Sequence, residues 1–383
     1  MTIERPAADA VMRFDVLDAL RGICALVVAL YHFQSNGYIS SLALVKNGWL
    51  FVDYFFVLSG FVIAHSYGTR LANREVSVGR FMGLRMGRIY PLHIAVLLAF
   101  IALEMVLVLG GETIAQYVSR EAFTGSRSPE GLWQSVFLLQ SFGLGEAQGW
   151  NIPAWSIAAE IWTYLLFAIV FLAPKRAMLG IAAVLSLGCL AWMTSYSDDL
   201  HITFDGGILR CIFGFGIGVL TYHAFRRFGG IGGTAWELAA LLATVAFVSF
   251  TTRTLTFAAP FVFAAMIFVL ASQRGAVSRA LGAKPFQLLG LTSYSIYMIH
   301  MFAQGRIGEV LQVTGIVDLS VDSMGRTVLQ GTPLVSDAIT LAMLAIVVAG
   351  SFVTYYLVEK PGRDLSRRLL SRPTEARVAQ GAA

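Results

Sequence analysis

Charged residues are scarce in this chain, and their scarcity limits the classes of protein it can belong to. Only 13% of its 383 residues are charged, whereas 57% are hydrophobic. A soluble globular protein carries charge on roughly a quarter of its residues. The composition excludes a soluble domain as the body of the protein and predicts an integral membrane protein. The formal net charge of +5 comes from basic residues between apolar segments, so no nucleic-acid partner is expected.

Cysteine and histidine are also few, with three and six residues respectively. Cys24, Cys189 and Cys211 lie inside apolar segments, where cysteine acts as a small packing residue. The histidines are scattered without the spacing of a metal site, so neither a disulfide, a metal nor a bound cofactor is predicted. Four histidines near segment ends are assigned no role: His65, His93, His201 and His223.

Long apolar runs dominate what is present. About twenty apolar residues cross a bilayer as a helix, and ten segments approach that length. The predicted spans are 14–33, 48–66, 90–109, 153–173, 177–194, 206–224, 234–251, 255–271, 286–304 and 338–358. We therefore predict an all-α polytopic membrane helix bundle of about ten transmembrane helices. It forms a single domain over residues 1–373, followed by a short disordered tail at 374–383.

The distribution of lysine and arginine predicts the orientation of this bundle. With the N-terminus in the cytoplasm, 20 of the 28 basic residues fall in cytoplasmic segments, six in outer loops and two within spans. Basic residues concentrate on the cytoplasmic side of membrane proteins, so both termini are expected there. The outer loop 110–152 is expected to lie on or dip into the membrane interface, and the outer loop 305–337 to shape an entrance.

Ionisable residues interrupt the first predicted span at Asp15, Asp18, Arg21 and His32. Placing any of these side chains near the centre of a bilayer costs free energy, so each is expected to have a partner or a function. On a helix, Arg21 and His32 share one face at a separation of about 16 Å. Asp18 lies three residues before Arg21 and can pair with it. The sequence thus predicts a polar stripe that ends in a titratable imidazole.

Two later spans also carry polar residues at helical spacing. They are Ser156, Glu160 and Tyr164 in the fourth span, and Ser293, Tyr297 and His300 in the ninth. Residues at these spacings share one helix face. By itself, Glu160 fits a structural hydrogen bond as well as a functional carboxylate. For His300 and the tyrosines, an interfacial role is the simpler interpretation.

Arginines suggest two further contacts. Arg85 and Arg88 lie one helical turn apart, just before the third predicted span. Two guanidinium forks could grip a pyrophosphate, although loop charge alone favours membrane anchoring. Arg210 lies within the sixth span and must be neutralised, with Asp53 and Glu160 as candidate partners.

Six sequence blocks, taken in order, resemble the acyltransferase-3 family of membrane O-acyltransferases. They are LDALRG at 17–22 leading to His32, FFVLSGF at 55–61, RMGRIYP at 85–91, the segment from Trp155 to Tyr164, SYSIYMIH at 293–300, and VEKP at 358–361. Together they extend over residues 14 to about 365. Each block alone is a weak signal, but six in this order make the resemblance specific.

This resemblance implies an enzyme that transfers an acyl group, most often acetyl, from cytoplasmic acyl-CoA to a carbohydrate hydroxyl. The acceptor would be extracytoplasmic or lipid-linked, and the membrane would be the bacterial inner membrane. The expected partners are therefore acyl-CoA as co-substrate, a carbohydrate or glycolipid, and the lipid bilayer. By the same resemblance, His32 matches the catalytic histidine, and Arg85 and Arg88 match arginines that serve the donor.

The remaining candidates follow from this hypothesis. Asp18, Arg21 and Glu160 join His32 as catalytic candidates, with Arg21 also on the donor side. The candidates for the acceptor side or the pocket wall are Ser59, Trp155, Tyr164, Arg210, Tyr297 and His300. The alternative is a transporter or flippase of a lipid-linked sugar or small anion, because polar residues at mid-membrane depth suit transport too. The sequence contains no inverted repeat that would favour it.

Overall fold

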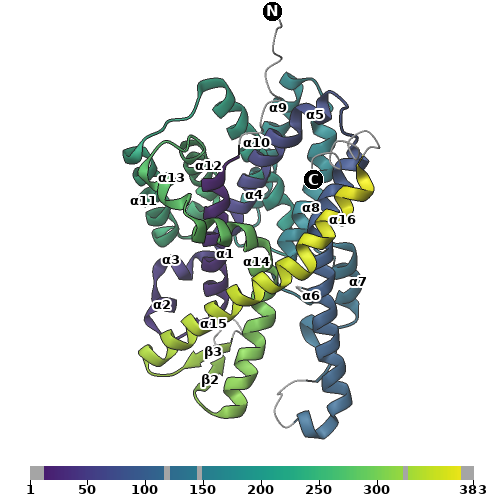
Figure 1. Ribbon diagram of the computed structural model, residues 1–383, viewed down its shortest axis with the longest axis vertical. Helices are drawn as coiled ribbons and strands as arrows, with labels where there is room; N and C mark the ends of the chain where they lie inside the picture. Colours follow the sequence, from purple (N-terminus) through teal and green to yellow (C-terminus); the bar gives the residue numbers. More distant parts are fainter. Residues whose placement is uncertain (1–12, 116–120, 145–148, 322–326, 372–383) are drawn as a thin grey trace, which may run out of the picture.

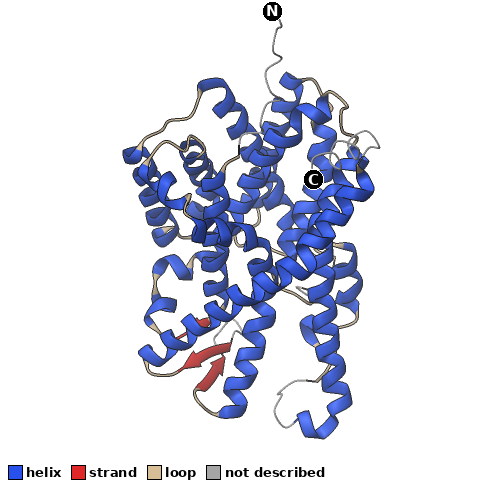
Figure 2. Cartoon of the chain, in the orientation of Figure 1, coloured by secondary structure: helices blue, strands red, loops and turns tan. Residues whose placement is uncertain are grey.

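The computed structural model describes residues 13–115, 121–144, 149–321 and 327–371 (Figure 1). This part of the chain is mostly helical and contains one small sheet (Figure 2). The prediction of an all-α polytopic bundle is confirmed, with the sheet as a local exception. The predicted tail at 374–383 lies outside the described residues.

The helices follow one another along the chain. The α-helices are α1 (Asp15–His32), α2 (Tyr38–Ser41), α3 (Ala43–Lys46), α4 (Phe51–Ile63), α5 (Thr69–Ala72), α6 (Val78–Ala115), α7 (Glu130–Phe137), α8 (Ala154–Val170), α9 (Lys175–Thr194), α10 (Gly207–Phe228), α11 (Thr234–Phe250), α12 (Ala259–Leu270), α13 (Ala276–Leu281), α14 (Lys284–Thr314), α15 (Pro333–Thr354) and α16 (Lys360–Leu370). Short 3-10 segments are η1 (Gly48–Leu50), η3 (Gly125–Arg127) and η4 (Arg253–Ala258), and π-helical turns are η2 (Ala64–Gly68) and η5 (Tyr355–Glu359).

Each of the ten predicted spans coincides with one of these helices. Within the described residues, six helical stretches are long and apolar enough to cross a membrane, and two further apolar helices have 17 residues. The first helix, α1, has 18 residues but carries the charges of Asp15, Asp18 and Arg21. Membrane insertion of several helices is therefore clear from length and composition, whereas the number ten stays a prediction.

Several helices extend beyond the apolar segments that predicted them. Helix α6 begins at Val78, twelve residues before the predicted start of the third span, and continues through Pro91. The segment of Arg85 and Arg88 is therefore the first part of a helix rather than a loop. Helix α15 likewise passes through η5 into α16. Hydropathy detects the stretch that suits lipid, whereas backbone hydrogen bonding continues a helix past it.

The described residues of the predicted outer loop 305–337 include regular secondary structure. Helix α14 continues to Thr314, and the chain then forms strands β2 (Asp318–Val321) and β3 (Thr327–Gln330). Strand β3 pairs antiparallel with β2 and parallel with β1 (Gln34–Ser35), with Gln34 opposite Val328. Because β1 directly follows α1, the sheet ties the end of the first helix to this loop.

Two ends of the bundle can be distinguished (Figure 1). The sheet lies at one end, here called the sheet end, while α5 and the last turns of α16 lie at the other. We call the latter the basic end, because it carries Arg70 of α5 with Arg367 and Arg368 of α16. His32 is the last residue of α1 and lies towards the sheet end. Arg85 lies in the second turn of α6 and belongs to the basic end.

The predicted outer loop 110–152 contains a segment that re-enters the bundle. Near the outer part of α6, Glu104 accepts hydrogen bonds from Arg127 and from the Phe123 backbone N–H. Helix α7 then runs back along α6, where the Tyr90 hydroxyl and a His93 ring nitrogen contact its last carbonyls. Glu104 lies fourteen residues after Tyr90 on α6, which corresponds to a rise of about 21 Å. The described part of this loop, residues 121–144, therefore packs along α6, and its position relative to the membrane interface stays a prediction.

Candidate functional site

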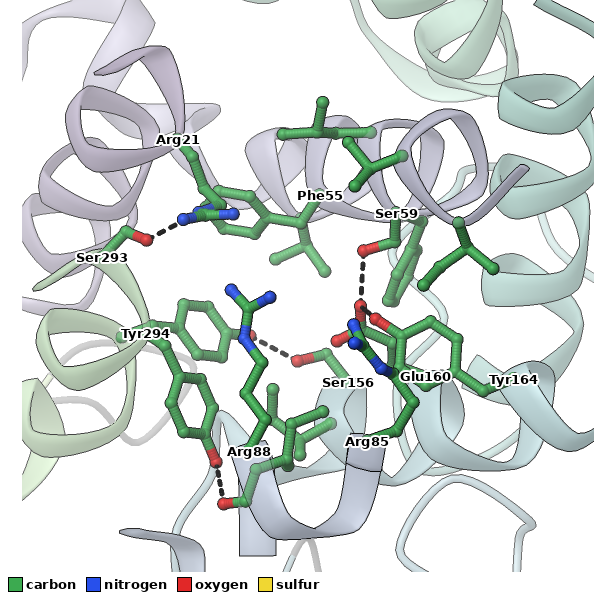
Figure 3. A pocket seen from close by; sticks show the side chains of 18 residues that line it. Arg21, Phe55, Ser59, Arg85, Arg88, Ser156, Glu160, Tyr164, Ser293 and Tyr294 are labelled. Carbon is green, nitrogen blue, oxygen red and sulfur yellow. Dashed lines mark hydrogen bonds between the residues drawn. The ribbon is translucent and has the colours of Figure 1, made fainter. Parts of the chain in front are cut away.

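A cavity opens among five helices (Figure 3), and its lining includes Arg85 of the basic end. Its volume is about 860 Å³, including the part open to solvent. Polar and aromatic side chains from α1, α4, α6, α8 and α14 line it. They are Arg21, Phe55, Ser59, Arg85, Arg88, Ser156, Glu160, Tyr164, Ser293, Tyr294 and Tyr297. The structure therefore brings together most of the residues that the sequence selected from separate spans.

Arg21 joins the cavity to the contact between α1 and α14. Its Nε donates to Ser293 Oγ at 2.7 Å, and a terminal nitrogen donates to the Gly290 carbonyl at 3.0 Å. The predicted pairing with Asp18 is confirmed, with 3.2 Å between Nη1 and Oδ1. Asp18 itself is not among the residues that line the cavity. The pair fixes the guanidinium on α14 while leaving it facing the cavity.

Glycines permit this close approach of the two helices. A Cβ built on Gly22 would lie 2.4 Å from the Leu289 carbonyl carbon, and one on Gly290 would lie 2.4 Å from the Asp18 carbonyl oxygen. Carbon atoms normally approach to about 3.5–4.0 Å, so neither position has room for a side chain. The backbone-to-backbone contact explains how Arg21 reaches a carbonyl of α14.

Two arginines enter the cavity from the first turns of α6. The Arg85 guanidinium lies 4.9 Å from the centre of the Tyr67 ring and donates to the Tyr67 hydroxyl at 3.0 Å. Its Nε is buried and has no hydrogen-bond partner among the described residues. Arg88 extends into the same space from one turn further along (Figure 3). The cation–π contact orients Arg85 and leaves a donor available for an anion.

Glu160 is the one carboxylate among the residues that line the cavity, against three guanidinium groups. It accepts hydrogen bonds from the hydroxyls of Ser59 and Tyr164. The predicted common face of Ser156, Glu160 and Tyr164 is confirmed, since all three line the cavity. Guanidinium charge therefore exceeds carboxylate charge, as an anion-binding site requires.

A pair of histidines lies beyond the cavity, towards the sheet end. His300 Nε2 is 3.3 Å from His32 Nδ1, and the ring centres are 5.0 Å apart. Neither histidine lines the cavity itself. Tyr297 lies between the two sites, because its ring is 5.9 Å from that of His300 while its hydroxyl pairs with Ser156 Oγ at 2.7 Å. The side chain of Tyr297 thus separates the cavity from the histidine pair.

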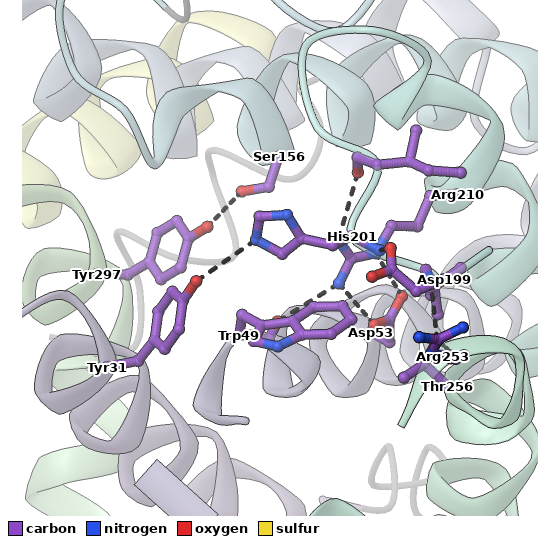
Figure 4. Close-up of polar contacts among 12 residues, drawn as sticks. Tyr31, Trp49, Asp53, Ser156, Asp199, His201, Arg210, Arg253, Thr256 and Tyr297 are labelled. Atoms are coloured by element: carbon purple, nitrogen blue, oxygen red, sulfur yellow. Dashed lines mark hydrogen bonds and ion pairs between the residues drawn. The ribbon is translucent and has the colours of Figure 1, made fainter. Parts of the chain in front are cut away.

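The buried arginine of α10 belongs to a separate contact (Figure 4). Arg210 forms two hydrogen bonds with Asp53, at 2.9 and 2.7 Å, and is 1% exposed. Of its two candidate partners, Asp53 is therefore correct and Glu160 is not. The guanidinium also lies over the rings of Trp49 and Trp155. Trp155 and Arg210 do not line the cavity, because this ion pair and its aromatic neighbours hold them behind its wall.

Two of the histidines that were assigned no role from the sequence make specific contacts. His93 is buried and its Nε2 lies 2.8 Å from the Ser135 carbonyl of α7, so its predicted peripheral position is wrong. His201 Nε2 lies 3.4 Å from the hydroxyl of Tyr31, the residue that precedes His32 (Figure 4). The ring of His201 packs on Trp49. No local pattern could have indicated these contacts, because each joins segments far apart in the sequence.

A second close contact between helices involves Gly218 of α10, which lies four residues after Gly214. A Cβ on Gly218 would lie 2.0 Å from the Val57 carbonyl oxygen of α4.

Among the described residues, no group of three histidine, cysteine or carboxylate side chains could hold a metal ion.

Comparison with known proteins places these residues in a family. A family model described as an acyltransferase domain matches residues 14–356. The chain is 26% identical to acyltransferase MdmB of Streptomyces mycarofaciens over 94% of both chains. It is 25% identical to peptidoglycan O-acetyltransferase OatA of Listeria monocytogenes over 78% of its own length and 50% of that relative, so it spans half of OatA. No solved structure matches it significantly.

A shorter relative matches part of the chain more strongly. It is 33% identical over 41% of this chain and 81% of its own length, and is named protein 2 in the picA locus, from Rhizobium radiobacter. That name describes no activity, so the assignment to a family rests on the family model and the two acyltransferases.

Proposed function

The chain belongs to the acyltransferase-3 family, and on that premise we propose that it is an O-acyltransferase of the bacterial inner membrane that uses acyl-CoA. Acetyl-CoA is the first candidate donor. The acceptor is a hydroxyl group of an extracytoplasmic or lipid-linked carbohydrate. Membership in an acyltransferase family favours this function over the alternative of a transporter or flippase.

The convergence of Arg21, Arg85 and Arg88 on one cavity is the observation that carries the proposal. Guanidinium groups bind phosphate oxygens through paired, charge-assisted hydrogen bonds. The buried Arg85 Nε is a donor without a partner among the described residues, and the donor phosphates would satisfy it. The positive-inside pattern supports a cytoplasmic position for the basic end, and acyl-CoA is available in the cytoplasm.

His32 is the general base in this proposal. Its Nδ1 lies 2.9 Å from the Val28 carbonyl oxygen. A carbonyl only accepts, so Nδ1 carries the hydrogen and the lone pair of the neutral ring is on Nε2. Unperturbed imidazole titrates near neutral pH, which suits a base that takes a proton from a hydroxyl.

The reaction then proceeds by direct transfer. The acceptor hydroxyl gives its proton to His32 Nε2 while its oxygen attacks the thioester carbonyl carbon. The tetrahedral adduct collapses, the carbon–sulfur bond breaks, and the CoA sulfur takes the proton from Nε2. Arg21, paired with Asp18, lies about 16 Å along α1 from His32, so it serves the donor in the cavity rather than the oxyanion. For the thioester to reach His32, the side chain of Tyr297 has to rotate away from Ser156.

Glu160 serves the donor cavity rather than proton transfer in this proposal. Both hydroxyl donors to its carboxylate, Ser59 and Tyr164, come from the cavity wall. Its charge partly offsets that of Arg85 and Arg88 when no donor is bound, and the carboxylate holds the wall of α4 against α8.

Binding of radiolabelled acetyl-CoA to the purified protein in lipid nanodiscs tests the donor site without an identified acceptor. Arg85→Ala and Arg88→Ala should each raise the Kd by about tenfold or more, because a hydrogen bond to a charged group contributes about 1.5–3 kcal/mol. Arg279→Ala is the matched control, since Arg279 is exposed on α13, away from the cavity. Unchanged affinity in both cavity variants would show that the donor binds elsewhere.

The rate of CoA release tests the role of His32 as general base. His32→Ala should keep the donor Kd of the wild type and lose CoA release in the presence of a saccharide acceptor. A variant that binds acetyl-CoA and still releases CoA at the wild-type rate would refute this role. Movement of acetyl-CoA or sugar across a vesicle membrane without cleavage of the thioester would favour the transporter.

A further inference from the structure

We infer that His300 is a positioning residue for His32, and that the two rings act as a hydrogen-bonded pair in which His300 accepts from the base. The inference rests on the proposed function of His32. It assigns to His300 a role distinct from the acceptor-side position expected from the sequence.

The backbone determines the tautomers of both rings. His300 Nδ1 lies 2.7 Å from the Tyr297 carbonyl oxygen, three residues earlier in α14. His32 Nδ1 lies 2.9 Å from the Val28 carbonyl oxygen, four residues earlier in α1. Each carbonyl can only accept, so each Nδ1 carries a hydrogen. In the neutral state, both lone pairs are therefore on Nε2.

The lone pair of His300 Nε2 is directed at His32. The two atoms His300 Nε2 and His32 Nδ1 are 3.3 Å apart, so the hydrogen on His32 Nδ1 is shared between the Val28 carbonyl and His300. This leaves His32 Nε2 as the basic atom of the pair. A catalytic base in other enzymes is held in its reactive tautomer by a third group that accepts from its far nitrogen, and His300 occupies that place here.

Charge development strengthens this contact during the reaction. When His32 takes the acceptor proton it becomes an imidazolium, and its Nδ1–H then donates as a charged group. Hydrogen bonds to charged groups contribute more than neutral ones. His300 is fully buried, so water cannot replace the interaction. The pair therefore stabilises the charged state of His32 more than its neutral state, and it lowers the barrier rather than improving donor binding.

Contacts within α14 and with α1 hold His300 near His32. Tyr297 supplies both the carbonyl that orients His300 and the ring that separates the pair from the donor cavity. Nearby, Gln304 of the same helix donates to the Ala29 carbonyl of α1 at 2.7 Å. Helices α1 and α14 are thus joined close to the histidine pair by Gln304 and further along α1 by the glycine contact.

A pair of substitutions at His300 tests the inference. His300→Gln keeps an acceptor oxygen near the position of Nε2, whereas His300→Leu has similar bulk and no acceptor. The assay measures CoA release from radiolabelled acetyl-CoA with chitotetraose as saccharide acceptor. His300→Leu should lower kcat by about 10- to 100-fold with a donor KM close to that of the wild type. His300→Gln should recover most of the loss.

A chemical readout separates this inference from the proposed function. Diethyl pyrocarbonate modifies the unprotonated Nε2 of histidine, and mass spectrometry measures its rate at His32. We expect a several-fold slower modification in His300→Leu and a near wild-type rate in His300→Gln. Equal rates and equal turnover in the wild type and both variants would refute the pairing. A wild-type protein that releases no CoA from any donor would refute the proposed enzyme, while the modification rates would still decide on His300.

Discussion

Replacement of Gly22 by alanine tests whether the contact between α1 and α14 positions the histidines. The added Cβ would lie 2.4 Å from the Leu289 carbonyl carbon, 2.6 Å from its oxygen and 2.7 Å from the Gly290 nitrogen. All three are backbone atoms of a long helix, so no side-chain rotation relieves the overlap. Normal contacts begin near 3.5 Å, and the two helices must therefore separate locally by about 1 Å.

The expected change in the free energy of unfolding is the sum of two opposing effects. Overpacking of this size destabilises a core by about 1–3 kcal/mol, whereas alanine in place of a helical glycine returns about 0.5–1 kcal/mol. We expect a net loss of about 1–2 kcal/mol in the free energy of unfolding. The separation also lengthens the contact between His32 and His300, now 3.3 Å, beyond hydrogen-bond range. Turnover should therefore fall by about tenfold.

Thermal unfolding in detergent and CoA release in nanodiscs measure the two effects. Gly188→Ala is the matched control, because Gly188 lies inside α9 and a Cβ there would have no neighbour within 4 Å. It should be neutral or slightly stabilising and leave turnover unchanged. If Gly22→Ala unfolds and turns over like Gly188→Ala, the close helix contact does not position the histidines.

Two further predictions concern buried charges. Asp53→Asn leaves the Arg210 guanidinium buried without its counter-charge, so we expect the free energy of unfolding to fall by about 3–5 kcal/mol; a melting temperature equal to that of the wild type would refute this. Glu104→Gln weakens the anchor of the re-entrant segment, since Glu104 accepts from Arg127 and the Phe123 N–H. Hydrogen exchange should then increase in residues 121–144 and not in α9, and uniform exchange across both regions would contradict this role.

The sequence determined the features that depend on local periodicity. Apolar runs gave the positions of the helices, because transfer to lipid depends on about twenty neighbouring side chains. Helical spacing correctly indicated that Asp18 pairs with Arg21 and that Ser156, Glu160 and Tyr164 share a face. The start of α6 and the end of α14 were misjudged, since hydropathy does not report where backbone hydrogen bonding stops.

Only the tertiary structure decided which distant groups meet. His32 and His300 are 268 residues apart, and no local pattern could specify that their rings pair beyond Tyr297. The choice of Asp53 over Glu160 for Arg210, and the re-entry of α7 along α6, also depend on which helices pack together. Helix packing is set by the fit of whole surfaces, as at Gly22 and Gly290. Periodicity therefore predicts the face on which a polar group lies, and packing selects its partner.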